Sequence, residues 1–90
     1  MENKMLYRIT VTGDVQGVGF RWRTMHEAHA RGICGFVENR PDGSVYIEAD
    51  GYREVLDDFV LWCKDGPGYV ENVRYDVKES AGYTDFTIRH

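Results

Sequence analysis

A glycine-rich segment that leads into an arginine is the part of this sequence whose residue types most clearly suggest chemistry. Residues 13–22 read GDVQGVGFRW, with three glycines within seven positions and Arg21 close behind them. Glycines allow left-handed backbone angles, so that successive N–H groups converge into a nest that receives an anion. Arg21 would add a permanently charged fork that matches phosphate or carboxylate oxygens. The segment therefore indicates an anion site, and a tight strand-to-helix connection without a ligand is the alternative.

The segments on either side of this loop have the patterns of a strand and a helix. Residues 6–12 read LYRITVT, in which every second side chain is apolar, as in a half-buried strand. Residues 21–31 favour a helix, and Gly32 follows where a left-handed C-terminal cap belongs. The free N–H groups and the positive dipole end of that helix would point into the loop. The sequence thus predicts that a strand and a helix together position the anion site.

The rest of the chain predicts the other elements of one small domain. Two helices cannot be buried inside 90 residues, so they should cover one face of a sheet. The order of elements predicts an α+β, ferredoxin-like split βαβ sandwich, with an antiparallel four- to five-stranded sheet and both helices on one face. We expect residues 1–90 to form a single domain. After the first helix, the predicted segments are a hairpin at 34–49, a helix at 52–64 and strands at 73–78 and 86–89.

Composition and charge argue against several kinds of partner. The formal net charge of −4 disfavours nucleic-acid binding, which needs a basic face. No apolar run reaches membrane-spanning length, and the N-terminal MENKMLYRIT lacks the apolar segment of a signal peptide. Cys34 and Cys63 make neither a disulfide framework nor a Cys-x-x-Cys motif. We therefore expect a reduced, cytoplasmic monomer without a nucleic-acid or membrane partner.

Two other sets of side chains suggest chemistry but have simpler interpretations. His26 and His29 share a helix face and Cys34 follows, yet no further ligand is spaced to complete a metal site. Solvent-facing histidines are the better interpretation, so we expect no metal. Trp22 and Trp62 are interpreted as packing residues rather than as stacking platforms.

Two stretches resemble the signatures of the acylphosphatase family. The segment GDVQGVGFR at 13–21 resembles the first signature, and GFVENRPDGSV at 35–45, followed by Gly51, resembles the second. The similarity extends to the closing DFTIR at 85–89. The resemblance implies hydrolysis of the carboxyl–phosphate bond of acyl phosphates, which yields a carboxylate and inorganic phosphate, with no metal and no cofactor. The implied partner is a small-molecule acyl phosphate.

The resemblance also implies a role for each residue of the site. Arg21 matches the family's phosphate-binding arginine, and Asn39 matches the asparagine that positions the attacking water. The leaving carboxylate is the base of an acid with a pKa of about 4, so no general acid is needed. A neutral amide cannot act as a base, so Asn39 would only orient water. The implied phosphate-binding residues are Gln16, Gly17, Val18, Gly19, Phe20 and Arg21.

Two acidic residues depart from the family pattern. Relatives commonly carry a basic residue at the position of Asp14, of Glu38 or of both. Without compensation these carboxylates would repel a dianionic substrate. A non-catalytic module of the same fold, which binds phosphate or a phosphorylated protein, is therefore the alternative function. A carbamoyl-phosphate-handling domain of a larger maturation protein is disfavoured, because the chain begins with methionine and ends with the predicted fold. Three basic residues could neutralise the two carboxylates: Arg8, Arg23 and Arg40.

Overall fold

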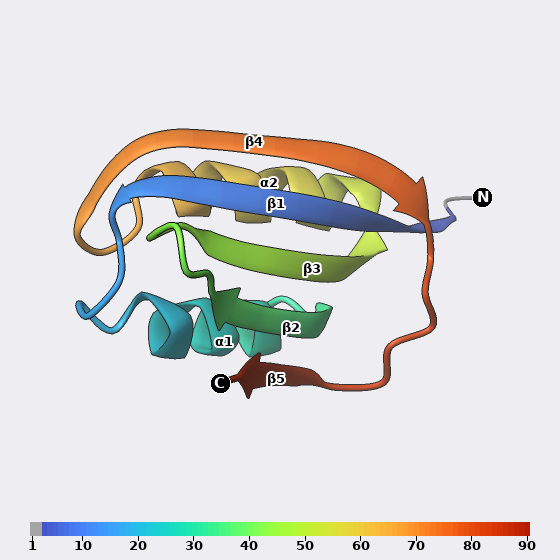
Figure 1. Ribbon diagram of the computed structural model, residues 1–90. Helices are drawn as coiled ribbons and strands as arrows, with labels where there is room; N and C mark the ends of the chain where they lie inside the picture. Colours follow the sequence, from blue (N-terminus) through green and yellow to red (C-terminus); the bar gives the residue numbers. More distant parts are fainter. Residues whose placement is uncertain (1–2) are drawn as a thin grey trace.

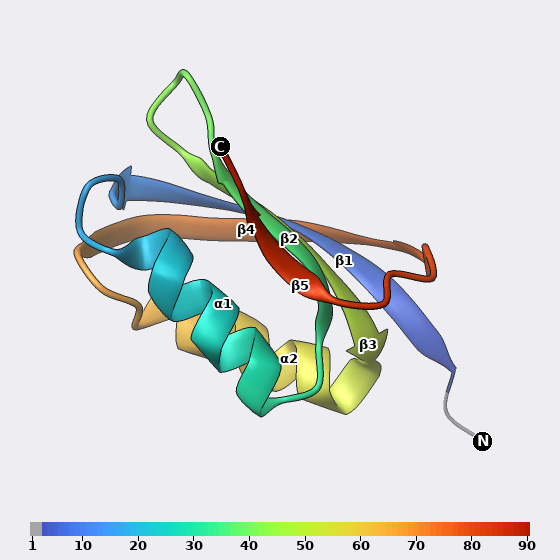
Figure 2. The same cartoon turned by 90° about the horizontal axis from the view of Figure 1, so that it is seen from below.

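A five-stranded sheet with both helices packed on one face makes up the computed structural model, which describes residues 3–90 (Figure 1). The strand order across the sheet is β4-β1-β3-β2-β5. Figure 2 shows α1 and α2 side by side on the same face of the sheet, which confirms the predicted ferredoxin-like α+β architecture. The elements are β1 (Lys4–Asp14), α1 (Phe20–Ala30), β2 (Cys34–Asn39), β3 (Val45–Tyr52), α2 (Arg53–Lys64), β4 (Tyr69–Glu79) and β5 (Phe86–Arg89).

The last strand corrects the expectation of an antiparallel sheet. β1 pairs antiparallel with β3 and β4, and β2 pairs antiparallel with β3. β5, in contrast, runs parallel to β2, with Gly35 opposite Phe86 and Glu38 opposite Arg89. The reason is the direction of β4, which finishes at the same end of the sheet as the start of β2, so the chain crosses to the opposite edge and enters β5 in the direction of β2. The sheet is therefore mixed.

A buried carboxylate holds the crossover between β4 and β5 in place. Asp50, only 5% exposed, accepts hydrogen bonds from the Ser80 hydroxyl at 2.8 Å, from the Ala81 N–H at 2.7 Å and from the Gly82 N–H at 3.1 Å. Such charge-assisted bonds stabilise both the buried charge and the loop that supplies the donors. Asp50 thus helps to dock β5 at the edge of the sheet.

The bounds of both helices lie close to those predicted from the sequence. The residues that end α1 show why this boundary could be predicted. Gly32 has a φ of 68°, as predicted for the cap. The N–H of Ile33 donates to Ala28 O at 2.9 Å, and the N–H of Gly32 donates to His29 O at 3.2 Å. This pair of bonds satisfies the last carbonyl groups of the helix in a Schellman motif. Among the described residues, neither helix has the length or the apolarity that crossing a bilayer requires.

The hydrophobic core lies between the sheet and the helices, and it anchors both ends of the glycine-rich loop. Val15 and Phe20, at the two ends of the loop, are each 1% exposed. Phe20 packs against Trp62 of α2 with ring centroids 5.8 Å apart. Burial in this core raises the pKa of the Cys63 thiol to about 12, and both Cys63 and Cys34 are free, so no disulfide joins them. The loop therefore leaves and re-enters the core at fixed points.

Candidate active site

The β1–α1 loop forms one wall of a small pocket at the end of the sheet where β2 finishes. The pocket encloses about 150 Å³. Five residues implicated from the sequence line it: Gly17, Gly19, Phe20, Arg21 and Asn39. Four further lining residues were not predicted as site residues: Val15, Trp22, Ile88 and His90.

The loop backbone presents an electropositive surface to this pocket. Gly17 and Gly19 have φ angles of 77° and 78°, the left-handed conformation that glycine adopts without strain. Helix α1 begins directly after Gly19, and its first hydrogen bond runs from the Arg23 N–H to Gly19 O at 3.0 Å. The N–H groups that precede this bond have no side-chain cap, and the first turn contains no acidic residue. Free N–H groups at a helix start attract anions, so the predicted nest has the polarity that a phosphate needs.

Arg21 adds a full positive charge at the same helix start. Its Nη1 lies 3.3 Å from Nδ1 of His90, which follows β5. Among the ion pairs of residues 3–90, none involves Arg21. A cation at the positive end of a helix dipole is electrostatically unfavourable. The charge of Arg21 is therefore uncompensated by any carboxylate and available to an anionic ligand.

Asn39 is the last residue of β2 and faces the pocket from the sheet. Side chains alternate along a strand, so Asn39 lies on the same face as the fully buried Val37, toward the helices. The Oδ1 atom of Asn39 is buried and accepts no hydrogen bond from the described residues. Buried polar atoms without a partner are rare and costly in native proteins. This oxygen is thus an acceptor placed for a donor that the rest of the fold does not supply.

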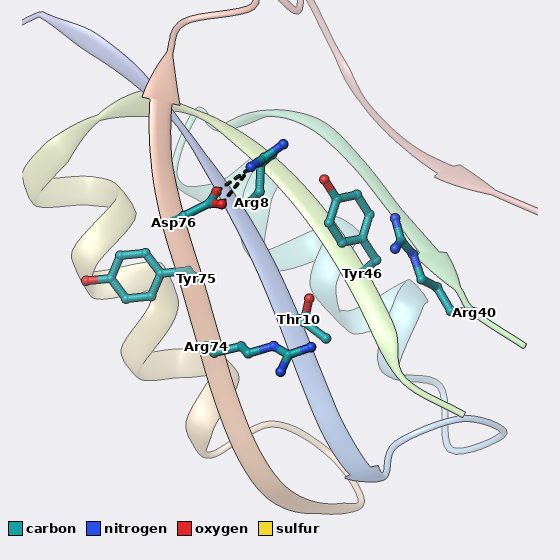
Figure 3. A pocket seen from close by; sticks show the side chains of 7 residues that line it. All are labelled: Arg8, Thr10, Arg40, Tyr46, Arg74, Tyr75 and Asp76. Atoms are coloured by element: carbon teal, nitrogen blue, oxygen red, sulfur yellow. Dashed lines mark hydrogen bonds and ion pairs between the residues drawn. The ribbon is translucent and has the colours of Figure 1, made fainter. Parts of the chain in front are cut away.

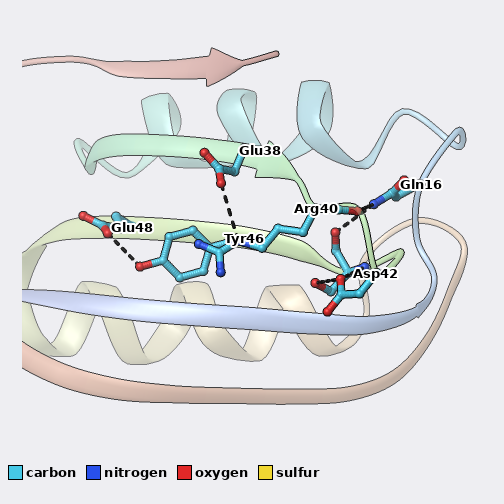
Figure 4. Close-up of polar contacts among 7 residues, drawn as sticks. Gln16, Glu38, Arg40, Asp42, Tyr46 and Glu48 are labelled. Carbon is cyan, nitrogen blue, oxygen red and sulfur yellow. Dashed lines mark hydrogen bonds and ion pairs between the residues drawn. The ribbon is translucent and has the colours of Figure 1, made fainter.

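Neither of the two unusual acidic residues lines the pocket. Glu38 points to the opposite face of the sheet from Asn39, and its Oε2 lies 3.4 Å from Nε of Arg40 (Figure 4). Asp14 is exposed at the end of β1 and is absent from the pocket lining. Arg8 neutralises neither of them, because its guanidinium is bound by Asp76 (Figure 3). Because neither carboxylate lines the pocket, they should repel a dianionic substrate less than the sequence suggested. For Glu38, the positive charge of Arg40 reduces the repulsion further.

The side chain of Gln16 has a structural contact rather than a place in the pocket. Its Nε2 donates to Arg40 O and to Ser44 O, each at 2.8 Å, and so joins the loop to the β2–β3 turn (Figure 4). Asp42 stabilises the same turn by accepting bonds from the Ser44 N–H at 2.9 Å and hydroxyl at 2.6 Å, which lower the pKa of its carboxyl. We call the two bonds made by Gln16 the loop–hairpin clamp. They fix the nest relative to Asn39.

Val18 also projects away from the pocket, since its side chain is 46% exposed and does not line it. Any part of Gln16 and Val18 in phosphate binding is therefore limited to their backbone N–H groups. The other four predicted loop residues do line the pocket.

Three residues that line the pocket were missed from the sequence or interpreted differently. One follows the loop in α1, and two lie near the C-terminus. Trp22 is 55% exposed and its ring is tilted by 45° against that of His26, with centroids 3.9 Å apart, so its interpretation as a packing residue is wrong, whereas Trp62 does pack against the core. Ile88 reaches the pocket because β5 pairs with β2, and His90 lies 69 residues from the arginine it contacts. No local pattern in the sequence signals such a contact.

Comparisons with known proteins identify the family of this chain. A family model described as Acylphosphatase matches residues 7–88. An acylphosphatase of Nostoc sp. is 40% identical over 83 residues, which cover 90% of this chain and 82% of that protein. The crystal structure of acylphosphatase from Bacillus subtilis is similar with a TM-score of 0.92 at 39% identity, covering 96% of this chain and 99% of that one. Full-length HypF in its phosphate- and nucleotide-bound form contains a similar domain, with a TM-score of 0.88 at 25% identity, but this chain covers only 12% of it. The chain is therefore an enzyme that belongs to the acylphosphatase family.

Proposed function

We propose that this enzyme hydrolyses small acyl phosphates in the pocket of about 150 Å³, where the loop N–H groups and Arg21 hold the phosphoryl group and Asn39 orients the attacking water. One observation supports this assignment above the others. An uncompensated guanidinium, an uncapped helix start and the unpartnered Oδ1 of Asn39 all border the same small pocket.

The first step is capture of the phosphoryl group. Its oxygens accept hydrogen bonds from the N–H groups between Gly17 and Trp22, and the guanidinium of Arg21 pairs with the same group. Phosphoryl transfer is accelerated mainly by positioning and by stabilising charge on the equatorial oxygens. Each donor aimed at developing charge is worth about 3 kcal/mol in comparable sites. The nest and Arg21 can therefore supply most of the required stabilisation.

The second step is attack by water. A water molecule that donates a hydrogen bond to Asn39 Oδ1 is held beside the phosphoryl group, and its oxygen bonds to phosphorus as the bond from phosphorus to the acyl oxygen breaks. The electron pair of the broken bond leaves with the carboxylate, which needs no proton because its acid is strong. The proton of the attacking water passes to a phosphate oxygen. The products are one carboxylate and one inorganic phosphate.

The test is the release of phosphate from benzoyl phosphate by the purified protein and its variants. Arg21→Ala should lower kcat/KM by about 10³-fold or more, as when an arginine is removed from other phosphoryl-transfer sites. Asn39→Ala should lower kcat by about 10²-fold while the affinity for inorganic phosphate stays within about twofold, because the amide acts on water. Arg53→Gln is the charge-matched control, since Arg53 is exposed on α2 and its side chain makes one hydrogen bond within residues 3–90, to Sδ of Met5.

Two results would contradict the proposal. Wild-type activity in both Arg21→Ala and Asn39→Ala would remove these residues from the mechanism. Saturable phosphate binding without any turnover would instead support the non-catalytic binding module that the sequence left open.

We also infer that residues 1–90 act as one monomeric domain in a reducing compartment such as the cytoplasm. The free state of Cys34 and Cys63 is consistent with such a compartment. The nearly complete coverage of the Bacillus subtilis chain supports a single domain. Light scattering coupled to size-exclusion chromatography should give the mass of one chain, and a dimer mass would contradict the inference.

A further inference from the structure

A second hollow lies on the face of the sheet that carries no helix. It is a depression open to solvent with a volume of about 520 Å³, and we call it the open-face hollow. Three of the eight arginines of the chain line it, although the whole chain has a net charge of −4. Figure 3 shows their side chains approaching from β1, from β4 and from the turn after β2. The lining residues are Arg8, Thr10, Arg40, Tyr46, Arg74, Tyr75 and Asp76.

The register of the sheet explains why this face is hollowed. Thr10 on β1 is directly opposite Tyr46 on one side and Arg74 on the other. A short threonine between two long side chains leaves a depression whose walls are an aromatic ring and a guanidinium. The Thr10 hydroxyl makes no hydrogen bond to another group of residues 3–90, and its side chain lines the hollow beside Arg74 (Figure 3). The depression therefore contains a free hydroxyl group between its walls.

The three guanidinium groups differ in how they are held. Arg8 is fixed by Asp76, with Nε and Nη2 at 2.8 Å and 2.6 Å from the two carboxylate oxygens. Arg40 lies over the ring of Tyr46, 3.7 Å from its centroid, and its Nε lies 3.4 Å from Oε2 of Glu38. Arg74 has neither an ion pair nor a hydrogen bond within residues 3–90. Two guanidinium groups are thus held in place, and the third has no partner among the described residues. Because two of the three are already ordered, less conformational entropy is lost when an anion binds.

We propose that the open-face hollow is a second anion site, separate from the catalytic pocket, that takes a small phosphate monoester with a hydroxyl-bearing organic body, such as a nucleoside monophosphate. Arg74, Arg40 and the Thr10 hydroxyl hold the phosphate, while Asp76 at the rim accepts from a hydroxyl group of the ligand. The volume is in the range of small-molecule sites and exceeds what phosphate alone would fill. The acidic net charge opposes long polyanions more than a compact dianion.

The test is a titration of the ¹⁵N-labelled full chain with adenosine 5′-monophosphate, followed by two-dimensional NMR. Uncharged adenosine is the matched control ligand. We expect saturable shifts of the amides of Thr10, Tyr46 and Arg74 with the monophosphate only. The same shifts should occur with unchanged affinity in Arg21→Ala, because the open-face hollow does not depend on the catalytic nest or on the proposed mechanism of hydrolysis.

Two charge-matched variants complete the test. Arg74→Gln should raise the Kd for the monophosphate by about tenfold, the effect of losing one charge-assisted hydrogen bond. Arg53→Gln on the helix side should leave that Kd unchanged, and thermal unfolding should show that both variants are folded. Shifts confined to residues 15–21, equal binding of adenosine, or equal Kd values for the two variants would each overturn the proposal.

Discussion

The proposed catalytic pocket and the open-face hollow both contain arginine, but they differ in what surrounds the charge. Arg21 has no carboxylate partner among the described residues and borders an uncapped helix start. Arg8 and Arg40, on the other face, are paired with Asp76 and Glu38. Although the net charge of the chain is −4, no carboxylate of the described residues lines this small pocket. We propose that the dianion binds in the pocket of Arg21, whereas the charges on the other face also stabilise the sheet surface.

The two sites also differ in how the chain builds them. The proposed nest consists of consecutive residues, 17–22, and its proposed donors are backbone N–H groups. The open-face hollow consists of side chains from three strands and a turn, which meet only because of the strand register. The first is sensitive to backbone conformation, and the second is sensitive to individual side chains. The following predictions test that difference.

Among the changes that test this difference, the largest effect is expected from Arg21→Lys. A lysine keeps the charge but loses the planar fork, so kcat/KM for benzoyl phosphate should fall by about 10²-fold. The same exchange at Arg53, which pairs with no carboxylate of residues 3–90, should leave hydrolysis unchanged. Retention of more than half the activity in Arg21→Lys would show that charge alone suffices in the nest.

A smaller effect is expected when the loop–hairpin clamp is broken. Gln16→Ala removes two hydrogen bonds of 2.8 Å, so the free energy of unfolding should fall by about 1–2 kcal/mol. The nest would then be less well fixed relative to Asn39, and kcat should fall by about tenfold, since small misplacements of catalytic groups are costly. Gln16→Glu should be worse than Gln16→Ala, because a carboxylate would face two carbonyl oxygens.

Urea unfolding and benzoyl phosphate hydrolysis measure both consequences of the Gln16 variants. If Gln16→Ala lost phosphate affinity as fully as Arg21→Ala, the side chain would be a direct phosphate ligand, and its structural role would be contradicted.

The next effect concerns backbone conformation at Gly19. A Cβ added there meets no atom within 4 Å, so the cost of Gly19→Ala comes from its φ of 78° alone. That cost should be about 1–2 kcal/mol in the free energy of unfolding. Gly32→Ala is the matched control, because Gly32 has a φ of 68° and equally open space at the far end of α1. Both variants should lose similar stability in urea, but only Gly19→Ala should lower kcat/KM.

The smallest effect is expected at the ion pair on the open face. Hydrogen bonds from Arg8 lower the pKa of the Asp76 carboxyl below its ordinary value of 3.8. The charged form is favoured in the folded protein, so the stabilisation is present above pH 3.8 and is lost as the pH falls through the lowered folded value. Arg8→Gln should return the pKa of Asp76 toward its ordinary value in a ¹³C NMR titration. An unchanged pKa would contradict control by Arg8.

Much of the fold was predictable because its signals are local. Period-two and helical spacing located the strands and helices, and Gly32 marked the end of α1 by the αL conformation that only a glycine adopts readily. The position of Asn39 next to a hairpin was also predicted, although its role came from the family resemblance. Helix start, glycine loop and arginine are consecutive in the chain, so the outline of the nest follows from neighbours in sequence.

The sequence by itself thus determined the order of the elements, the polarity of the nest and the residues that could hold a phosphate. Only the tertiary structure decided the parallel pairing of β5, which brings Ile88 and His90 to the pocket, and the contact of Gln16 with the β2–β3 turn. It also decided that Glu38 faces away from Asn39 and toward Arg40. The physical reason is the separation of the interacting residues along the sequence. Backbone angles and helix dipoles depend on adjacent residues, whereas these contacts join segments that come together only when the sheet forms.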